Sequence, residues 1–136
     1  LWSRLFHAPA TQVLVEALYE HGAQVVITTS WLRFMLREGF ERLFAKTGLG
    51  VLNTSLHDAW EAPQNRGETR AQAIDRWLAA HHRGEPYVIL DDELSGTGLR
   101  HSVHDRRGRL ILCNENVGLH RGHMAAIRWA LSRPSE

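Results

Sequence analysis

The stretch Tyr87-Val88-Ile89-Leu90-Asp91-Asp92 leads four largely apolar residues into two adjacent carboxylates. Short, β-branched runs that are apolar on both faces are typical of strands buried in a parallel sheet. Val25-Val26-Ile27-Thr28 and Leu110-Ile111-Leu112-Cys113 have the same character. These stretches predict three strands, and the strongest of them, Tyr87 to Leu90, ends directly at Asp91 and Asp92.

Apolar residues at helical spacing fill most of the segments between these strands. Residues 54–65 and 93–108 contain turn formers and no such period, so both are predicted as loops, with a weak strand candidate at Val51–Asn53. The alternation of strands and helices predicts a three-layer α/β domain with a mainly parallel sheet. The predicted helices run from an N-cap at Thr11 to Gly22, from Trp31 to about Lys46, from the residue after Gly67 to about His82–Gly84, and from about His120 to Leu131.

The composition is that of one ordinary folded domain, predicted over residues 1–131 with a frayed tail at 132–136. The chain has 136 residues, 16 basic and 15 acidic side chains and 43% hydrophobic residues. Its near-neutral charge excludes strong sequence-independent attraction to nucleic acid or lipid, and its apolar runs of about four residues are too short for a membrane span. The single cysteine, Cys113, is expected to be buried, and a reducing, cytoplasmic setting is the expected location of the protein. Trp77 and Trp129 are expected in the core.

Hydroxyl groups follow the first strand. Ligands of open α/β sheets bind beyond the carboxyl ends of the strands. There, Thr28, Thr29 and Ser30 precede a predicted helix, whose N-terminal amides favour anions such as phosphate. The alternative interpretation is that Thr28 ends the strand and Ser30 caps the helix.

Charged side chains lie at two further places, one directly after a predicted strand and one directly before a predicted helix. Asp91 and Asp92 offer the oxygen ligands that Mg²⁺ prefers, although a solvated turn would also tolerate them. Arg66 precedes the amphipathic helix, where a guanidinium could neutralise phosphoryl charge. Alternatively, Arg66 is an exposed loop residue or a partner of Glu61 or Glu68.

The order of hydroxyl, cation and carboxylate pair resembles the haloacid dehalogenase-like (HAD) phosphohydrolases, over most of the chain. Several segments are similar to the HAD domain of Swiss Army Knife RNA-repair proteins. The resemblance implies a Rossmann-like fold, with Thr28 as second motif, Arg66 as third, and Asp91 and Asp92 as fourth. Thr29 and Ser30 then become phosphate contacts. The similar segments are Val25 to Arg33, Arg66-Gly67-Glu68 with Ile74 and Trp77-Leu78, Tyr87 to Glu93, and Val117-Gly118-Leu119.

The family's first motif, a strand ending in Asp-x-Asp that carries the nucleophile, has no match in this sequence. The other aspartates, Asp58, Asp75 and Asp105, follow no apolar strand. In the family's sheet this strand is central, and its loss would leave buried backbone groups unpaired. Two explanations stay open: the motif lies upstream of Leu1, which is the expectation favoured here, or the domain is degenerate.

The resemblance implies Mg²⁺-dependent phosphomonoester hydrolysis through an aspartyl phosphate on an upstream aspartate. Asp92 is the first choice as metal ligand and Asp91 as its partner, with exchange of the two roles left open. The alternative is a catalytically inactive domain that binds a phosphate-containing ligand or a protein. The partner would be a phosphorylated small molecule or a nucleic-acid end; the sequence does not indicate the oligomeric state.

Overall fold

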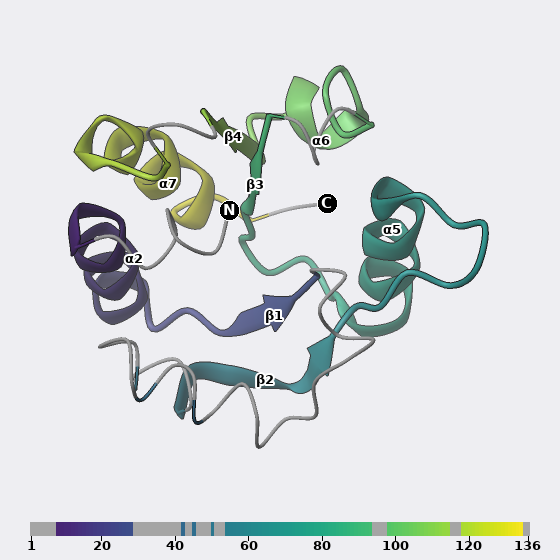
Figure 1. The fold of residues 1–136 in the computed structure, drawn as a ribbon, viewed down its shortest axis with the longest axis horizontal. Coiled ribbons are helices and arrows are strands. Elements are labelled where there is room, and N and C mark those ends of the chain that lie inside the picture. The colour runs from purple at the N-terminus through teal and green to yellow at the C-terminus, as the bar shows by residue number, and fades with distance from the viewer. Residues whose placement is uncertain are drawn as a thin grey trace. The chain divides into compact units, whose positions relative to one another are not determined.

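The computed structural model describes residues 8–28, 42, 45, 50, 54–93, 98–114 and 118–134 (Figure 1). The chain divides into two compact units. One, called here the β3–β4 unit, comprises Leu1–Ala17 and Arg83–Glu136, and the other, the β1–β2 unit, comprises Leu18–His82. Among the described residues, each unit holds one two-stranded parallel sheet. Helices and short parallel strands confirm the predicted α/β class.

The β3–β4 unit is built on two strands in unbroken register. β3 (Ile89–Asp92) pairs with β4 (Leu110–Cys113), residue for residue, from Ile89 opposite Leu110 to Asp92 opposite Cys113. The unit also contains the first part of α2 (Ala8–His21), up to Ala17, and three further elements. These are the single turn α6 (Val103–Arg106), the 3-10 turn η2 (Arg121–His123) and α7 (Met124–Leu131). The buried core that joins them consists of Ala10, Val13, Ala17, Ile111, Cys113, Leu119, Met124 and Ile127.

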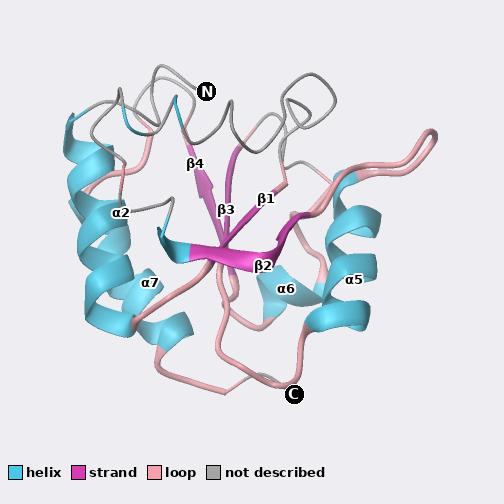
Figure 2. Ribbon diagram, turned by 90° about the horizontal axis from the view of Figure 1, so that it is seen from below, coloured by secondary structure: helices cyan, strands magenta, loops and turns pink. Residues whose placement is uncertain are grey.

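The β1–β2 unit is less regular. β1 (Val25–Ile27) pairs in parallel with β2 (Leu56–Glu61), and α5 (Arg70–His81) follows β2 in the chain. Val25 lies opposite Leu56, but Ile27 lies opposite Glu61, so two steps along β1 match five along β2. β2 therefore carries three extra residues, and its ribbon bends along its length (Figure 2).

Two strand predictions need correction. The predicted loop at 54–65 is wrong, because residues 56–61 form β2, where the extra residues break the alternation that marks a regular strand. The strongest strand begins two residues later than predicted and includes both aspartates, because its ladder starts with the bond from Ile89 N to Arg109 O (2.7 Å). The strand Leu110–Cys113 is confirmed.

The helix predictions hold in part. α5 confirms the helix after Gly67. α2 begins at Ala8 rather than after Thr11, because Pro9 in the first helical turn loses no intrahelical hydrogen bond. The predicted loop 93–108 contains α6, and the last helix is preceded by η2. Apart from residues 42 and 45, the predicted helix from Trp31 to Lys46 and the strand at 51–53 lie outside the described residues.

Trp129 is not in the core: 43% of its surface is exposed, whereas Trp77 is partly buried. Cys113 is buried, as predicted. None of the helices in the described part of the chain has the length and apolar character to cross a bilayer. The division into one domain and a frayed tail stays a prediction.

Candidate active site

The two aspartates are the last residues of β3, and both are almost completely buried. Asp91 is 5% exposed and Asp92 is 4% exposed. The backbone N–H of Asp92 donates to Oδ1 of Asp91 at 2.8 Å, so one oxygen of the Asp91 carboxylate is engaged by the main chain. Successive residues of a strand point to opposite faces, and the two carboxylates therefore leave β3 in different directions. This asymmetry agrees with different roles for the two side chains.

The pKa of the Cys113 thiol reflects the negative charge at the carboxyl end of β3 and β4. Cys113 lies opposite Asp92 in the ladder, and the next residue, Glu93, donates its N–H to the Cys113 carbonyl at 3.0 Å. Burial and, after it, the negative charges of Asp91, Asp92 and Glu93 together raise the pKa of the Cys113 thiol to about 11. The thiol is therefore neutral at pH 7 and is no nucleophile, while the three carboxylates make the carboxyl end of β3 attractive to a cation.

The chemistry of these donors fits Mg²⁺. Buried carboxylates are costly unless positive charge or hydrogen-bond donors compensate them. Mg²⁺ takes hard oxygen ligands, and it commonly binds one or two carboxylates and keeps several waters. Within the described part of the chain, no group of three or more His, Cys, Asp or Glu side chains could hold a metal ion. A site at Asp92 would accordingly be of the kind that leaves coordination positions for water and substrate.

Thr28 stands at the carboxyl end of β1 and is partly buried. The preceding residue, Ile27, accepts a hydrogen bond at its carbonyl from the N–H of Ala62, at 2.9 Å. The residue after β2 is thus held beside the end of β1. The other two predicted phosphate contacts, Thr29 and Ser30, lie outside the described residues.

Arg66 is exposed and lies in the turn between β2 and α5. Gly67, in the same turn, has φ +80°, a left-handed conformation that glycine adopts without steric cost. Arg66 is four residues beyond Ala62, which limits the span between their Cα atoms to about 14 Å. The turn therefore starts close to Thr28 in space.

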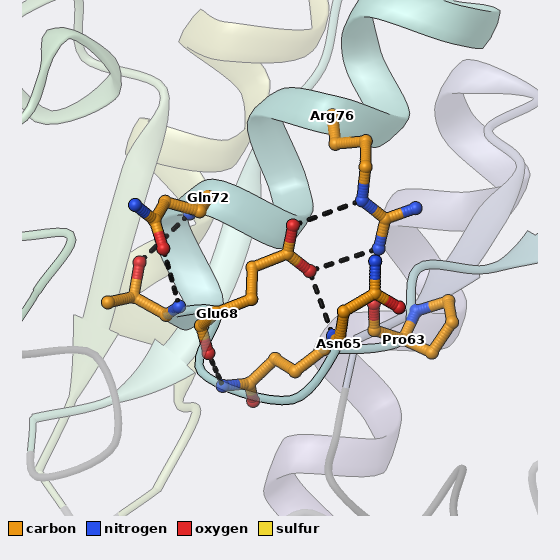
Figure 3. Close-up of polar contacts among 7 residues, drawn as sticks. Pro63, Asn65, Glu68, Gln72 and Arg76 are labelled. Carbon is orange, nitrogen blue, oxygen red and sulfur yellow. Dashed lines mark hydrogen bonds and ion pairs between the residues drawn. The ribbon is translucent and has the colours of Figure 1, made fainter.

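The segment that carries Arg66 is organised by Glu68 (Figure 3). The Glu68 carboxylate accepts from Nε and Nη2 of Arg76, both at 3.1 Å, and from the backbone N–H of Asn65 at 2.9 Å. These bonds, first that from Arg76 and then that from Asn65, lower the pKa of Glu68. Arg76 also donates to the Pro63 carbonyl at 2.6 Å. Glu68 is thus paired with Arg76 rather than with Arg66, the partner considered from the sequence.

Sequence reasoning missed both this pairing and the cap of α5. Thr69 accepts from the Gln72 N–H at 3.1 Å, and the Gln72 side chain accepts from the Thr69 N–H at 2.8 Å, which is a capping box. The pattern Thr-x-x-Gln before an amphipathic helix is a local signal that could have found the cap. The bond from Arg76 to Glu68 spans eight residues and has no such local signature.

The predicted site residues thus fall into two groups. Asp91 and Asp92 belong to the β3–β4 unit, whereas Thr28 and Arg66 belong to the β1–β2 unit. The convergence of all four around one phosphate stays a prediction.

Residues 3–124 match the model of the HAD domain in Swiss Army Knife RNA repair proteins. No curated protein matches the chain. No solved structure matches it either.

Proposed function

This chain belongs to the family of the HAD domain in Swiss Army Knife RNA repair proteins, and from that membership we propose that it serves Mg²⁺-dependent hydrolysis of phosphomonoesters. The family indicates phosphohydrolase-type activity in general, and its domains generally use Mg²⁺. The observation that carries the proposal is the buried pair Asp91 and Asp92 at the carboxyl end of β3.

The residues of this chain would divide the work as follows. Asp92 would bind Mg²⁺ directly, because one oxygen of Asp91 already accepts the Asp92 N–H, and Asp91 would orient the groups around it. Bound Mg²⁺ would supply positive charge between the anionic nucleophile and the anionic phosphate. Thr28 would donate its hydroxyl hydrogen to a phosphoryl oxygen, assisted by Thr29 and Ser30, and Arg66 would balance the charge of the transferring group.

The covalent step needs an aspartate beyond those named here. A carboxylate oxygen of the motif's first aspartate would attack phosphorus while the bond to the ester oxygen breaks and the motif's second aspartate gives that oxygen a proton. The second aspartate would then take a proton from the water that hydrolyses the aspartyl phosphate to aspartate and phosphate. The family's Asp-x-Asp motif matches no part of the printed sequence, so we assign the nucleophile to a segment outside it. The substrate would be a phosphorylated small molecule or a nucleic-acid end.

The same missing match favours a second candidate function. Without the nucleophilic aspartate, the domain would bind a phosphate-containing ligand or a protein partner and would not turn it over. The residues that contact phosphate would be unchanged, so binding alone does not separate the two functions.

Hydrolysis of an aryl phosphate by the full-length protein tests the proposal. We expect turnover that requires Mg²⁺, is lost in EDTA, and falls at least about 100-fold in Asp92→Asn. Asp75→Asn, an exposed carboxylate on α5, is the matched control and should retain activity. If the full-length protein binds phosphate but shows no metal-dependent turnover, the binding function replaces the enzymatic one.

A further inference from the structure

The extra residues of β2 lie where its backbone has no regular partner on β1. Between the pairs Val25 with Leu56 and Ile27 with Glu61, residues 57–60 of β2 face a single residue of β1. Bulges of this kind leave backbone groups unpaired and occur often beside functional sites, where they redirect the chain.

Two side chains bind the backbone N–H and carbonyl of Ala59, a residue of the bulge. The N–H of Ala59 donates to Nδ1 of His57 at 2.9 Å, and the carbonyl of Ala59 accepts from the indole Nε1 of Trp77 at 2.8 Å. The indole also packs edge-on against the His57 ring, with centroids 5.1 Å apart and planes at 76°, and against His81 at 5.1 Å. His57 and Trp77 thus replace the strand partner that Ala59 lacks, and Trp77 joins the bulge to α5.

The bulge determines which residue follows the end of β1. With it, Glu61 lies opposite Ile27, and Ala62 binds the Ile27 carbonyl next to Thr28. In an unbroken register Asp58 would lie opposite Ile27, and three more residues would separate that point from Arg66. Three extended residues span about 10 Å, which is enough to move the turn relative to Thr28.

We propose that His57 and Trp77 are positioning residues for phosphate binding, because they hold the bulge that sets the spacing between Thr28 and the turn of Arg66. This inference rests on the proposed function for the role of Thr28 and Arg66. The backbone part of it depends only on the contacts in the β1–β2 unit.

Amide hydrogen exchange of the full-length protein measures the backbone part without any turnover. In Trp77→Phe and in His57→Leu, which each remove one side-chain bond to Ala59, we expect the Ala62 amide to exchange about tenfold faster. His57→Asn should restore slow exchange, since the Asn carbonyl can accept the Ala59 N–H in an Asx-turn. Trp129→Phe, a partly exposed tryptophan of the other unit, is the control and should change nothing at Ala62.

Affinity for phosphate measures the functional part. The two disruptive variants should raise KM for the aryl phosphate several-fold, with kcat less affected, and should weaken inhibition by inorganic phosphate equally. In a protein without turnover, titration with inorganic phosphate replaces KM, so the failure of catalysis does not remove the test. Unchanged exchange at Ala62, faster exchange at Leu112 of β4 to the same degree, or unchanged phosphate affinity would each overturn the inference.

Discussion

The two parallel strand pairs differ in what holds them. β3 and β4 pair at four consecutive positions, and the ladder carries the almost fully buried Asp91 and Asp92 at its end. β1 and β2 pair at two positions with an insertion between them. Of the nearby candidate residues, Thr28 is partly buried and Arg66 is exposed. The candidate metal ligands therefore rest on regular backbone structure, whereas the candidate phosphate contacts depend on individual side-chain bonds. We expect substitutions in the two units to differ accordingly.

The largest effect is expected from the buried arginine of the β3–β4 unit. Arg109 is 5% exposed and donates to the carbonyls of Ala130 and Pro134, with the second bond at 3.0 Å. Arg109→Met would leave both carbonyls without this donor and should lower the free energy of unfolding by about 3 kcal/mol. The measurement is urea denaturation followed by far-UV circular dichroism.

Arg76 of the β1–β2 unit is the matched comparison, because its side chain is exposed to solvent where it pairs with Glu68. Arg76→Met should shift the urea midpoint much less than Arg109→Met, since solvent screens exposed pairs. A shift as large as that of Arg109→Met would contradict the difference between the units.

The reactivity of Cys113 tests how closed the carboxyl end of β3 and β4 is. The raised pKa of about 11, against an ordinary value of 9.0, keeps the thiol protonated, so its thiolate fraction at pH 8 is about 100-fold lower than in an unfolded chain. We expect alkylation by iodoacetamide to be at least about 100-fold slower in the folded protein than in urea. Similar rates in both states would show that this end of the sheet is open.

A smaller effect is expected from the cap of α5. Thr69→Ala removes the acceptor for the Gln72 N–H and should destabilise the helix by about 1 kcal/mol. Thr69→Ser keeps the hydroxyl and serves as the control. Hydrogen exchange along α5 measures the change, and equal exchange in Thr69→Ala and Thr69→Ser would show that the cap contributes nothing.

The smallest effect concerns pH. Burial lowers the pKa of His123, and the neighbouring His120 adds to the shift. The ring accepts the His120 N–H at Nδ1 (3.1 Å), a bond that only the neutral ring can make, while Glu16 of α2 binds Arg121 and Arg128 nearby. The unfolded chain binds this proton near pH 6.5 and the folded protein only at lower pH.

Folding stability should consequently decrease as the pH falls below about 6.5, and the decrease should end below the folded-state pKa. Urea midpoints between pH 8 and 5 measure it. His123→Asn can accept the same N–H without titrating, so its midpoint should depend less on pH. An equal dependence in both proteins would assign the effect to other groups.

The regular parts of the molecule could be predicted from the sequence, and the irregular parts could not. Short-range sequence patterns predict the strand Leu110–Cys113 and the helix α5, and the structure confirms both. β2 was missed because its extra residues remove the period of two that identifies a strand. The bond from Trp77 to Ala59 joins residues 18 positions apart, a contact that only the folded chain creates.

The candidate site shows the same limit. Hydropathy marked Asp91 and Asp92 as residues after a strand, whereas the backbone ladder extends through both and buries them. The types of side chain indicated Mg²⁺ and phosphate chemistry, because those preferences belong to the functional groups themselves. Their burial and hydrogen bonds depend on tertiary contacts, which local sequence patterns do not encode.

Gly108 and Trp129 illustrate a constraint on sequence variation within this family. Gly108 has φ +70°, and a Cβ atom placed on it would lie 2.8 Å from the ring of Trp129. A larger residue at position 108 would thus be strained in this backbone conformation and would also clash with the indole ring. We expect relatives of this protein to covary at the two positions, with bulk at 108 tolerated only where 129 is small.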